Sequence, residues 1–222
     1  MNKVEIADRL QTCFSSVVHD VMRDEGLQSF TLPSSITPTK ENYKISGQIF
    51  TIEGEINNKL SHHESLLAWT GFLSKAPKNK IIICQPNNQE IALMGELSAE
   101  TLQNKGVRGC IIDGGCRDLE FILNIDFPIW CNFYTPRDVV GYWSPTKMEE
   151  KITIGNTIIN NNDYVMADID GVVVIPEDKA EDILLKSEKL IATESEIRKA
   201  IREGLIDNLN ALANIYNAVC KD

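Results

Sequence analysis

The spacing of apolar residues along the chain predicts a succession of helices and strands. From Ile6 to Val21 apolar side chains recur at steps of three and four residues, which is the repeat of an amphipathic helix, and this helix is expected to end near Gly26. Further along, short apolar runs predict strands, and longer stretches with a helical repeat or composition predict helices between them. The expected strands are 45–52, 81–84 and 110–112, and the expected helices are 62–73, 95–104 and 117–124.

The second half of the chain has a different pattern. Short β-rich pieces separated by Gly and Asn turns predict a section of hairpins that closes the sheet. From Glu177 the chain is expected to be helical, with a break at Gly204 and a second helical repeat from Leu205 to Val219. No repeat, low-complexity tract or linker divides the chain, so residues 1–222 are expected to form a single mixed α/β domain with helices at both ends. The β-rich pieces are 152–154, 157–159, 164–167 and 172–175.

Composition and charge narrow the class of protein. Of the 222 residues, 43% are hydrophobic and 24% are charged, as in ordinary folded domains. There are 22 basic and 32 acidic residues, and the formal net charge of −10 disfavours direct binding of nucleic acid. The first ten residues lack the apolar core of a signal peptide, and no run approaches the roughly 18 apolar residues of a membrane span. We therefore expect a cytoplasmic protein with no membrane or direct nucleic-acid partner.

The cysteines do not form a recognisable metal or disulfide pattern. They are far apart, without a CxxC pair or a neighbouring histidine motif, which disfavours a zinc site and a disulfide framework. We interpret them mostly as buried thiols that pack as small apolar side chains. The six are Cys13, Cys84, Cys110, Cys116, Cys131 and Cys220.

The segment from Gly106 to Glu120, GVRGCIIDGGCRDLE, carries the strongest chemical signal. Its apolar strand ends in a turn at Gly114 and Gly115 that delivers Arg117 and Asp118 to the start of a helix, beyond the carboxyl end of the strand. A guanidinium can bind a carboxylate with two hydrogen bonds, and an adjacent carboxylate can bind a hard cation that the same oxyacid ligates. The alternative is that Asp118 is a helix N-terminal charge and that Arg117 is a surface residue.

A second element precedes this one. The sequence Gly95-Glu96-Leu97-Ser98 opens the preceding helix, whose first backbone N–H groups are free to bind an anion. Glu96 is separated from Arg117 by twenty intervening residues.

This arrangement resembles the family of 4-hydroxy-4-methyl-2-oxoglutarate aldolases, which also includes the regulator of ribonuclease activity A (RraA). The matching features are GEL, the acidic residue followed by twenty residues and Arg-Asp, and DGGCRD; the segments 135–137 (TPR) and 168–176 (DIDGVVVIP) extend the resemblance over most of the chain. The resemblance implies a layered α/β/β fold of swivelling-domain type with a mixed sheet. It also implies a homotrimer or a dimer of trimers, with active sites between subunits.

The activity that the resemblance implies is that of a class II aldolase dependent on Mg²⁺ or Mn²⁺. Such an enzyme cleaves 4-hydroxy-4-methyl-2-oxoglutarate and similar 2-oxo acids to pyruvate, and it also decarboxylates oxaloacetate. Arg117 would bind the pyruvyl carboxylate and keto oxygen, and Asp118 would bind the metal directly. The backbone of Gly95, Glu96, Leu97 and Ser98 would line the substrate site, while Glu96 would hold a water near the metal that protonates the enolate.

The resemblance also implies a carboxylate from the C-terminal helix of a neighbouring subunit, which acts on the metal through water. Glu194, four residues before Arg198, is the matching position. The helical repeat supports this choice, since Glu194 shares a stripe with Leu190, Ile197 and Ile201, and a carboxylate on an apolar stripe needs a partner. The alternative is a surface glutamate that only borders the stripe.

Three departures from the family pattern bear on substrate identity, because we expect them around the pocket. The segment 85–90 (QPNNQE) lacks the usual glycines, Met94 replaces a common aromatic residue, and Asp138 replaces a frequent glycine after Pro136-Arg137.

Two other functions remain open: a non-catalytic protein-binding regulator on the same scaffold, and an aldolase-like enzyme for a different oxyacid.

Other polar residues fit structural roles better. His62 and His63 begin a helix, where a surface or capping role is favoured over acid–base chemistry. Asp168 and Asp170 flank a turn before a valine-rich strand, which favours an Asx-type turn. Neither GxGxxG nor GxxxxGK[ST] occurs, so no nucleotide-binding loop is indicated.

Overall fold

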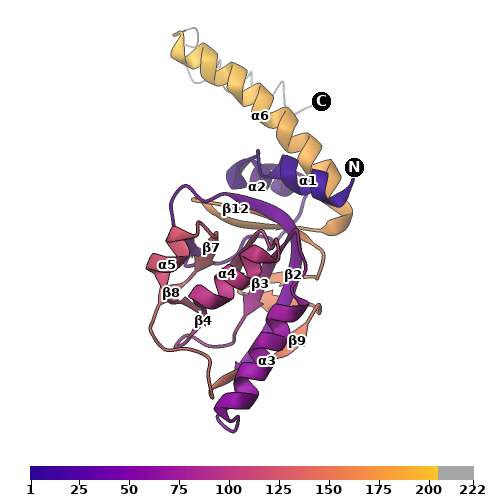
Figure 1. Cartoon of the computed structure of the whole chain (residues 1–222). Helices are drawn as coiled ribbons and strands as arrows, with labels where there is room; N and C mark the ends of the chain where they lie inside the picture. Colours follow the sequence, from indigo (N-terminus) through magenta and orange to yellow (C-terminus); the bar gives the residue numbers. More distant parts are fainter. Residues whose placement is uncertain (205–222) are drawn as a thin grey trace.

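An eight-stranded mixed β-sheet forms the centre of the computed structural model, which describes residues 1–204 (Figure 1). Four neighbouring strands, β7, β5, β3 and β2, run parallel to one another. The strands beyond them, and β9 beside β2, pair in antiparallel fashion. The order is β1 (Thr37–Pro38), β7 (Ile129–Cys131), β5 (Gly109–Ile112), β3 (Lys80–Gln85), β2 (Ile45–Ile56), β12 (Tyr164–Asp168) and β13 (Gly171–Ile175), with β9 (Trp143–Met148) off this path.

A second, three-stranded sheet is formed by segments that follow strands of the first. After β3, β5 and β7, the chain forms the short strands β4 (Ala92–Met94), β6 (Gly115–Cys116) and β8 (Phe133–Tyr134). These three pair in parallel in the order β4-β6-β8. Because parallel strands end at the same edge of a sheet, the segments that follow β4, β6 and β8 are brought together there. A separate hairpin pairs β10 (Ile152–Ile154) with β11 (Thr157–Ile159).

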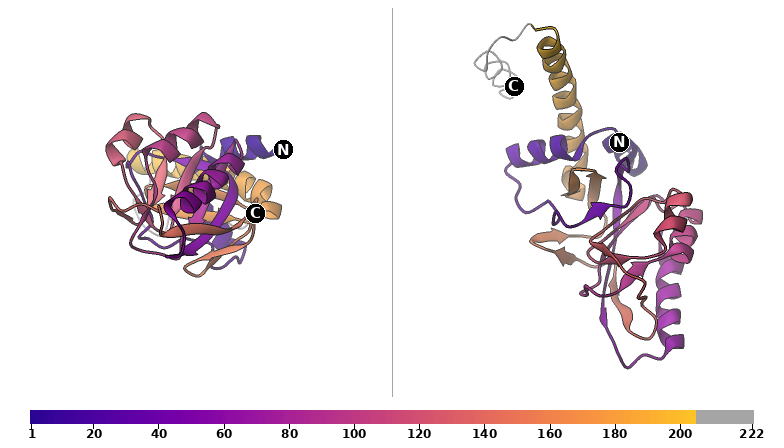
Figure 2. Two further views of the ribbon diagram at one scale, coloured as in Figure 1. Left: turned by 60° about the horizontal axis from the view of Figure 1, so that its bottom comes forward. Right: turned by 90° about the vertical axis from the view of Figure 1, so that its left-hand side faces the viewer.

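Helices cover the sheet at two places (Figure 2). Helices α3 (His62–Lys75), α4 (Glu96–Asn104) and α5 (Leu119–Asn124) enclose a core with the main sheet that contains Phe50, Phe72 and Trp143. Helices α1 (Lys3–Leu10), α2 (Ser15–Asp24) and the first part of α6 (Ala180–Arg202) pack against β12 and β13, and a short 3-10 turn at Glu177–Lys179 precedes α6. The rest of α6 projects away from the body of the molecule (Figure 1).

The prediction of one long N-terminal helix is wrong, because the chain forms α1 and α2 with a break between them. Phe14, the residue before α2, is extended and offers no side-chain cap. Instead, the Ser15 N–H donates to Asp168 Oδ2 at 2.8 Å and the Ser15 hydroxyl donates to Asp168 Oδ1 at 2.5 Å. A carboxylate 153 residues away therefore caps α2 and fixes its start, which no local repeat could indicate.

The other predicted helices and strands are present, and the mixed α/β class with terminal helices is confirmed. Of the two predicted hairpins, β12 and β13 extend the main sheet, whereas β10 and β11 remain separate from it. The strands β1, β4, β6, β7, β8 and β9 were not predicted. Asp168 Oδ1 also accepts from the Asp170 N–H at 3.0 Å, so the predicted Asx-type turn is present. The second C-terminal repeat, Leu205 to Val219, lies outside the described residues. No helix within residues 1–204 is long and apolar enough to cross a membrane.

The five cysteines among the described residues are buried and unpaired, as predicted, and Cys220 lies outside this part of the chain. Burial raises the pKa of the Cys13 thiol to about 11 and raises the pKa values of Cys84 and Cys110 as well. These thiols stay protonated near neutral pH and are poor nucleophiles or metal ligands.

Candidate active site

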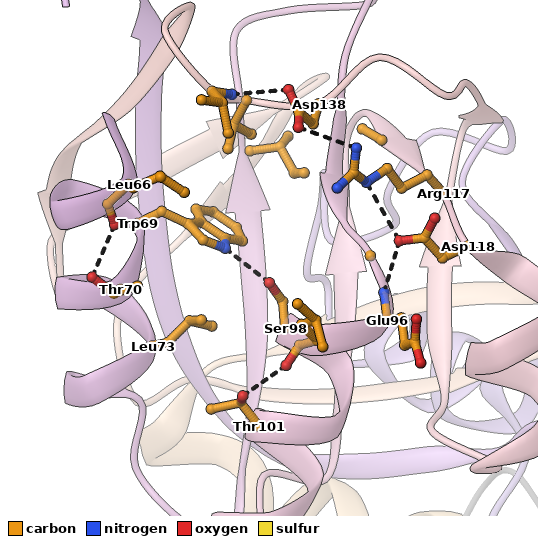
Figure 3. Close-up of a pocket in the computed structure, with 16 residues that line it drawn as sticks. Leu66, Trp69, Thr70, Leu73, Glu96, Ser98, Thr101, Arg117, Asp118 and Asp138 are labelled. Carbon is orange, nitrogen blue, oxygen red and sulfur yellow. Dashed lines mark hydrogen bonds and ion pairs between the residues drawn. The ribbon is translucent and has the colours of Figure 1, made fainter. Parts of the chain in front are cut away.

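A cavity of about 460 Å³ lies between α3 and the carboxyl edge of the small sheet (Figure 3). This volume is within the range of small-molecule sites. The segment after β4 contributes the first turn of α4, the segment after β6 contributes Arg117 and Asp118, and the segment after β8 contributes Asp138. The structure thus brings together six of the predicted site residues, namely Gly95, Glu96, Leu97, Ser98, Arg117 and Asp118.

The backbone after β6 turns so that Asp118 faces the start of α4. The Arg117 N–H donates to the Met94 carbonyl at 2.9 Å, which extends the pairing of β6 with β4. Asp118 then adopts a left-handed conformation with φ of 56° at the N-cap position of α5. A non-glycine residue in this region is uncommon, and asparagine and aspartate tolerate it best. The turn directs the Asp118 carboxylate toward α4 rather than over its own helix, where it makes no capping bond.

Asp118 is held in place by the first turn of α4. The Glu96 N–H donates to Asp118 Oδ2 at 3.1 Å, so the positive end of this helix faces the carboxylate. Gly95 makes the approach possible, because a Cβ atom at this position would lie 2.6 Å from Asp118 Oδ2 and 3.1 Å from Arg117 Nε. The glycine of the GEL motif is therefore required by close packing, and its own φ of −136° is open to any residue.

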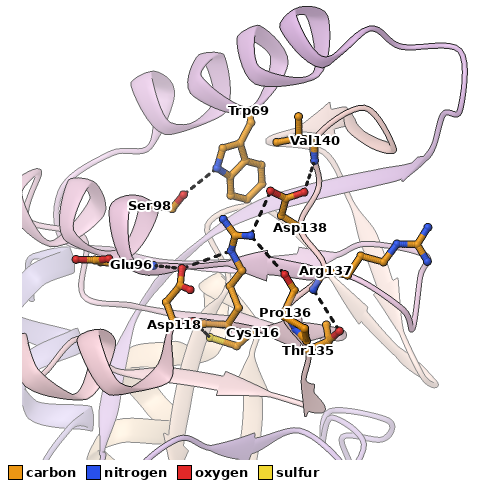
Figure 4. Close-up of polar contacts among 11 residues, drawn as sticks. Trp69, Glu96, Ser98, Cys116, Asp118, Thr135, Pro136, Arg137, Asp138 and Val140 are labelled. Atoms are coloured by element: carbon orange, nitrogen blue, oxygen red, sulfur yellow. Dashed lines mark hydrogen bonds and ion pairs between the residues drawn. The ribbon is translucent and has the colours of Figure 1, made fainter.

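Arg117 lies between two carboxylates (Figure 4). Its Nε is 3.4 Å from Asp118 Oδ2 and its Nη1 is 3.2 Å from Asp138 Oδ2. Nη1 also donates to the Pro136 carbonyl at 3.5 Å. Nη2 makes no hydrogen bond within the described part of the chain. The guanidinium is thus oriented by the protein on two sides and keeps one nitrogen for a ligand.

Asp138 is the site residue that sequence reasoning did not assign. Its Oδ1 accepts from the Val140 N–H at 3.1 Å, which directs Oδ2 toward Arg117. The one indication of this role in the sequence was that Asp138 replaces a glycine that is frequent in the family. Three positions depart from the family pattern, and all three were expected around the pocket. Only Asp138 lines the cavity. Met94 is buried in the core, and no residue of the segment 85–90 is among the lining residues. The expectation that all three surround the pocket is wrong.

The segment 85–90 has a structural role instead. Gln85 Nε2 donates to Asp113 Oδ2 at 2.8 Å, and Asn132 Nδ2 donates to Asp113 Oδ1 at 2.8 Å. Asp113 therefore links the end of β3 with the segments just after β5 and β7, where the chain passes from the main sheet to the small one. His62 and His63 are exposed and do not line the cavity, and the cap of α3 is Ser61, which forms a capping box with Glu64.

The opposite wall of the cavity is mainly apolar. Leu66, Trp69 and Leu73 of α3 face the site residues across the cavity (Figure 3). The Trp69 Nε1–H donates to Ser98 Oγ at 2.8 Å. Because this bond uses Ser98 as an acceptor, the hydroxyl proton of Ser98 can be donated to a ligand.

Cys116, directly before Arg117, does not take part in this chemistry. A hydrogen bond with Cys131, together with burial, raises the pKa of the Cys116 thiol. A protonated, buried thiol supports the sheet beneath the site and is a weak metal ligand.

Glu194 lies far from the cavity of its own chain. It is on the projecting part of α6, where its carboxylate is 3.9 Å from Arg198. Leu190, at the start of the predicted stripe, packs against the core, whereas Ile201 near its end is 50% exposed. Residues 1–204 leave the outer part of this stripe uncovered.

The donor set at Asp118 fits a divalent cation of the Mg²⁺ type. Oδ2 is engaged by Glu96 and Arg117, and Oδ1 has no hydrogen-bond partner among residues 1–204. Those residues contain no cluster of three or more His, Cys, Asp or Glu side chains that could enclose a metal. Mg²⁺ commonly binds through one or two carboxylates and keeps several waters, so a single carboxylate oxygen open to the cavity is sufficient for a weakly held ion.

Comparison with known proteins identifies the family to which this fold belongs. Residues 15–174 match the family model described as RraA-like, Aldolase/RraA, and the chain belongs to this family. It is similar to protein DlpA of Legionella pneumophila, with 26% identity over 202 residues that make up 90% of this chain and 32% of DlpA. The chain therefore spans about a third of the length of that relative.

Two further comparisons cover nearly the whole of both proteins. A Halalkalibacterium halodurans protein named "Putative 4-hydroxy-4-methyl-2-oxoglutarate aldolase" is 23% identical over 208 residues, which are 92% of each chain. A crystal structure described as one of novel cellulases from microbes associated with the gut ecosystem superimposes with a TM-score of 0.83 and 28% identity, over 88% of each chain. These similarities confirm the family resemblance and the fold expected from the sequence.

The contact between Gly95 and Asp118 yields a testable prediction. Gly95→Ala should weaken the binding of Mn²⁺ by tenfold or more, because the new methyl group must displace the Asp118 carboxylate. Gly71→Ala is the matched control, since nothing lies within 4 Å of its Cβ position in α3, and it should leave the affinity unchanged. The affinity is measured from the electron paramagnetic resonance signal of free Mn²⁺. Equal affinities in the two variants would show that Asp118 does not bind the ion.

Proposed function

We propose that this protein is a divalent-metal-dependent carbon–carbon lyase that releases pyruvate from 4-hydroxy-2-oxo acids such as 4-hydroxy-4-methyl-2-oxoglutarate, and that it also decarboxylates oxaloacetate. The observation that carries the proposal is the placement of Arg117, Asp118 and the N-terminus of α4 around one cavity. The family description, Aldolase/RraA, and the name of the H. halodurans relative support it.

Substrate binding would use the donors left free in the cavity. Arg117 Nη2 is available for the C1 carboxylate and the keto oxygen, and the charge-assisted bond would hold the substrate in a fixed orientation. The first turn of α4 adds backbone N–H groups and its dipole, and the Ser98 hydroxyl adds one more donor. All three line the same cavity as Asp118.

The residues then act on the charge that develops during cleavage. When the C3–C4 bond breaks, its electron pair passes into the pyruvate enolate, and C4 leaves as a carbonyl once its hydroxyl proton is lost; with oxaloacetate, C4 leaves as CO₂. Arg117 is already oriented toward the developing negative charge, so little reorganisation is needed. A cation at Asp118 would supply Lewis-acid polarisation of the keto oxygen. A water held by Glu96 would protonate C3 of the enolate and complete pyruvate.

We further propose that Glu194 reaches the cavity of a neighbouring subunit and contacts its metal through water. Two features of α6 support this arrangement. The helix projects from the body (Figure 1), and residues 1–204 do not cover the outer part of the stripe that carries Glu194. A homotrimer, or a dimer of trimers, would close each cavity with a helix from another chain.

Removal of the metal tests the proposal directly. Exhaustive chelation with EDTA should abolish pyruvate release, because one carboxylate holds the ion weakly, and Mg²⁺ or Mn²⁺ should restore the rate. Pyruvate is measured by coupling to lactate dehydrogenase. Full turnover by protein shown to be metal-free by elemental analysis would contradict the proposal.

The contribution of the Arg117 guanidinium geometry can be tested separately from that of its charge. Arg117→Lys should lower kcat/KM by tenfold or more, about 1.4 kcal/mol or more in transition-state binding, because one ammonium group cannot contact Asp118, Asp138 and substrate together. Arg23→Lys is the control, since Arg23 is exposed and pairs with Asp20 and Asp24. A correctly folded Arg117→Lys protein within twofold of wild type would mean that Arg117 has a structural role only.

A mixing experiment tests the shared site. Arg117→Ala and Glu194→Ala proteins should each be nearly inactive, and activity should return in part when the two are unfolded together and reassembled. Some interfaces then combine an intact Arg117 with an intact Glu194 from another chain. Mass spectrometry confirms that mixed oligomers have formed. If they form and remain inactive, the two residues do not act in one site across an interface.

A further inference from the structure

The cavity does not provide a cation for a second carboxylate of the substrate. Arg117 is the one cationic side chain among the lining residues that the structure describes, and its guanidinium already contacts Asp118 and Asp138. The free nitrogen of Arg117 is assigned to the C1 carboxylate. The substrates proposed above nevertheless carry a second, distal carboxylate, and a carboxylate that leaves water needs a partner. This partner has to come from outside the lining residues.

Helix α6 carries a cation one turn beyond Glu194. Arg198 follows Glu194 by four residues, so the two side chains are neighbours on one face of the helix, and Arg198 Nη2 lies 3.9 Å from Glu194 Oε2. The Arg198 side chain is 55% exposed, and Glu194 is its one ion-pair partner within residues 1–204. If Glu194 reaches a neighbouring cavity, Arg198 therefore comes to the same cavity.

The spacing of Glu194 and Arg198 matches the length of the substrate. Four residues of an α-helix rise by about 6 Å along its axis. The two carboxylate carbons of 4-hydroxy-4-methyl-2-oxoglutarate are separated by four C–C bonds, which span about 5 Å in an extended chain. With Glu194 near the metal, Arg198 can lie near the distal carboxylate.

The charges of the cavity and of the outer part of α6 are complementary. Three carboxylates and one cation line the cavity. Residues 197–202 of α6 contain three cations, Arg198, Lys199 and Arg202, and no carboxylate. Opposite charges favour the approach of this part of the helix to the cavity of another subunit.

We infer that Arg198 is a specificity-determining residue that binds the distal carboxylate of the substrate in the cavity of a neighbouring subunit. The inference rests on the proposed function, including the placement of Glu194, and adds the residue that selects dicarboxylic substrates. A guanidinium can bind a carboxylate with two charge-assisted hydrogen bonds. An acid with a methyl group in place of the distal carboxylate gains nothing from this contact.

The test compares two substrates that differ at C5 alone. 4-Hydroxy-2-oxoglutarate ends in a carboxylate, and 4-hydroxy-2-oxopentanoate ends in a methyl group. We expect wild-type kcat/KM to favour the glutarate by tenfold or more. Arg198→Gln removes the charge and keeps a residue that is well tolerated in helices. It should lower kcat/KM for the glutarate by tenfold or more, mainly through a higher KM, and change the value for the pentanoate by less than twofold.

Lys199→Gln is the matched control. It removes a neighbouring cation from the same helix, about 100° further round the axis, and should leave the ratio of the two kcat/KM values unchanged. If Arg198→Gln lowers kcat/KM for both acids by the same factor, Arg198 acts on the helix or on assembly and the inference fails. A wild-type ratio near one, or in favour of the pentanoate, also overturns it.

Mixed oligomers test whether Arg198 acts across an interface. Arg198→Gln protein is unfolded and reassembled with an excess of Arg117→Ala protein. Most sites with an intact Arg117 then have an Arg117→Ala neighbour, whose α6 supplies an intact Arg198. The preference for the glutarate should return in this mixture. If mass spectrometry shows mixed oligomers and the ratio stays at that of Arg198→Gln alone, Arg198 does not bind substrate in another subunit.

A binding measurement separates this inference from the proposed lyase activity. With Mg²⁺ present, calorimetry should show that 2-oxoglutarate, which lacks the 4-hydroxyl group needed for cleavage, binds wild type at least tenfold more tightly than 2-oxopentanoate. Arg198→Gln should abolish this difference. If neither hydroxy acid yields pyruvate but this Arg198-dependent preference is found, the lyase proposal fails and the inference stands. Equal affinity for the two acids in wild type, or a preference that Arg198→Gln retains, overturns the inference whatever the activity.

Discussion

Parallel pairing of three very short strands determines the position of every proposed site residue in the body of the molecule. Strands β4, β6 and β8 contain three, two and two residues, and each continues from a longer strand of the main sheet. Because they pair side by side in the same direction, the residues that follow them meet at one edge. Strands this short have little stability by themselves, so the main sheet and Asp113, which bonds to Gln85 and Asn132, must hold them in register.

Close packing at this edge links the glycine, the arginine and the carboxylates into one unit. Asp118 can reach the N-terminus of α4 because Gly95 has no side chain, and Arg117 is oriented because Asp118 and Asp138 lie on two of its sides. The guanidinium therefore does not need to be ordered when a ligand binds, which reduces the entropic cost of binding. The same contacts make the site acidic overall, which favours a cation.

The structure could be predicted from the sequence mainly where residues that are neighbours in the chain determine it. Strand β5 and helix α5 could be predicted because the apolar run and the turn residues are neighbours in the chain, whereas the two-residue strand β6 between them, at Gly115–Cys116, was not predicted. The spacing from Glu96 to Arg117 fits one complete helix and strand between two turns, so the structure places both residues in one cavity.

Contacts between distant segments could not be predicted in this way. The break between α1 and α2 depends on Asp168, and the second partner of Arg117 is Asp138, twenty-one positions later in another loop. Neither contact follows from periodicity. Each depends on the length of a strand and on the direction in which the chain leaves the turn after it. The role proposed for Glu194 needs a second chain, and α6 shows only that residues 1–204 do not cover the outer part of its stripe.

The proposed lyase activity requires that Arg117 and Asp118 form one binding site for a 2-oxo acid and a divalent cation. The decisive experiment is a crystal of the protein soaked with Mg²⁺ and pyruvate. We expect density for the ion at Asp118 and for pyruvate between this ion and the Arg117 guanidinium, with its carboxylate toward the first turn of α4. Pyruvate bound elsewhere in the molecule, or an ion bound away from Asp118 while this edge of the small sheet stays empty, would contradict it.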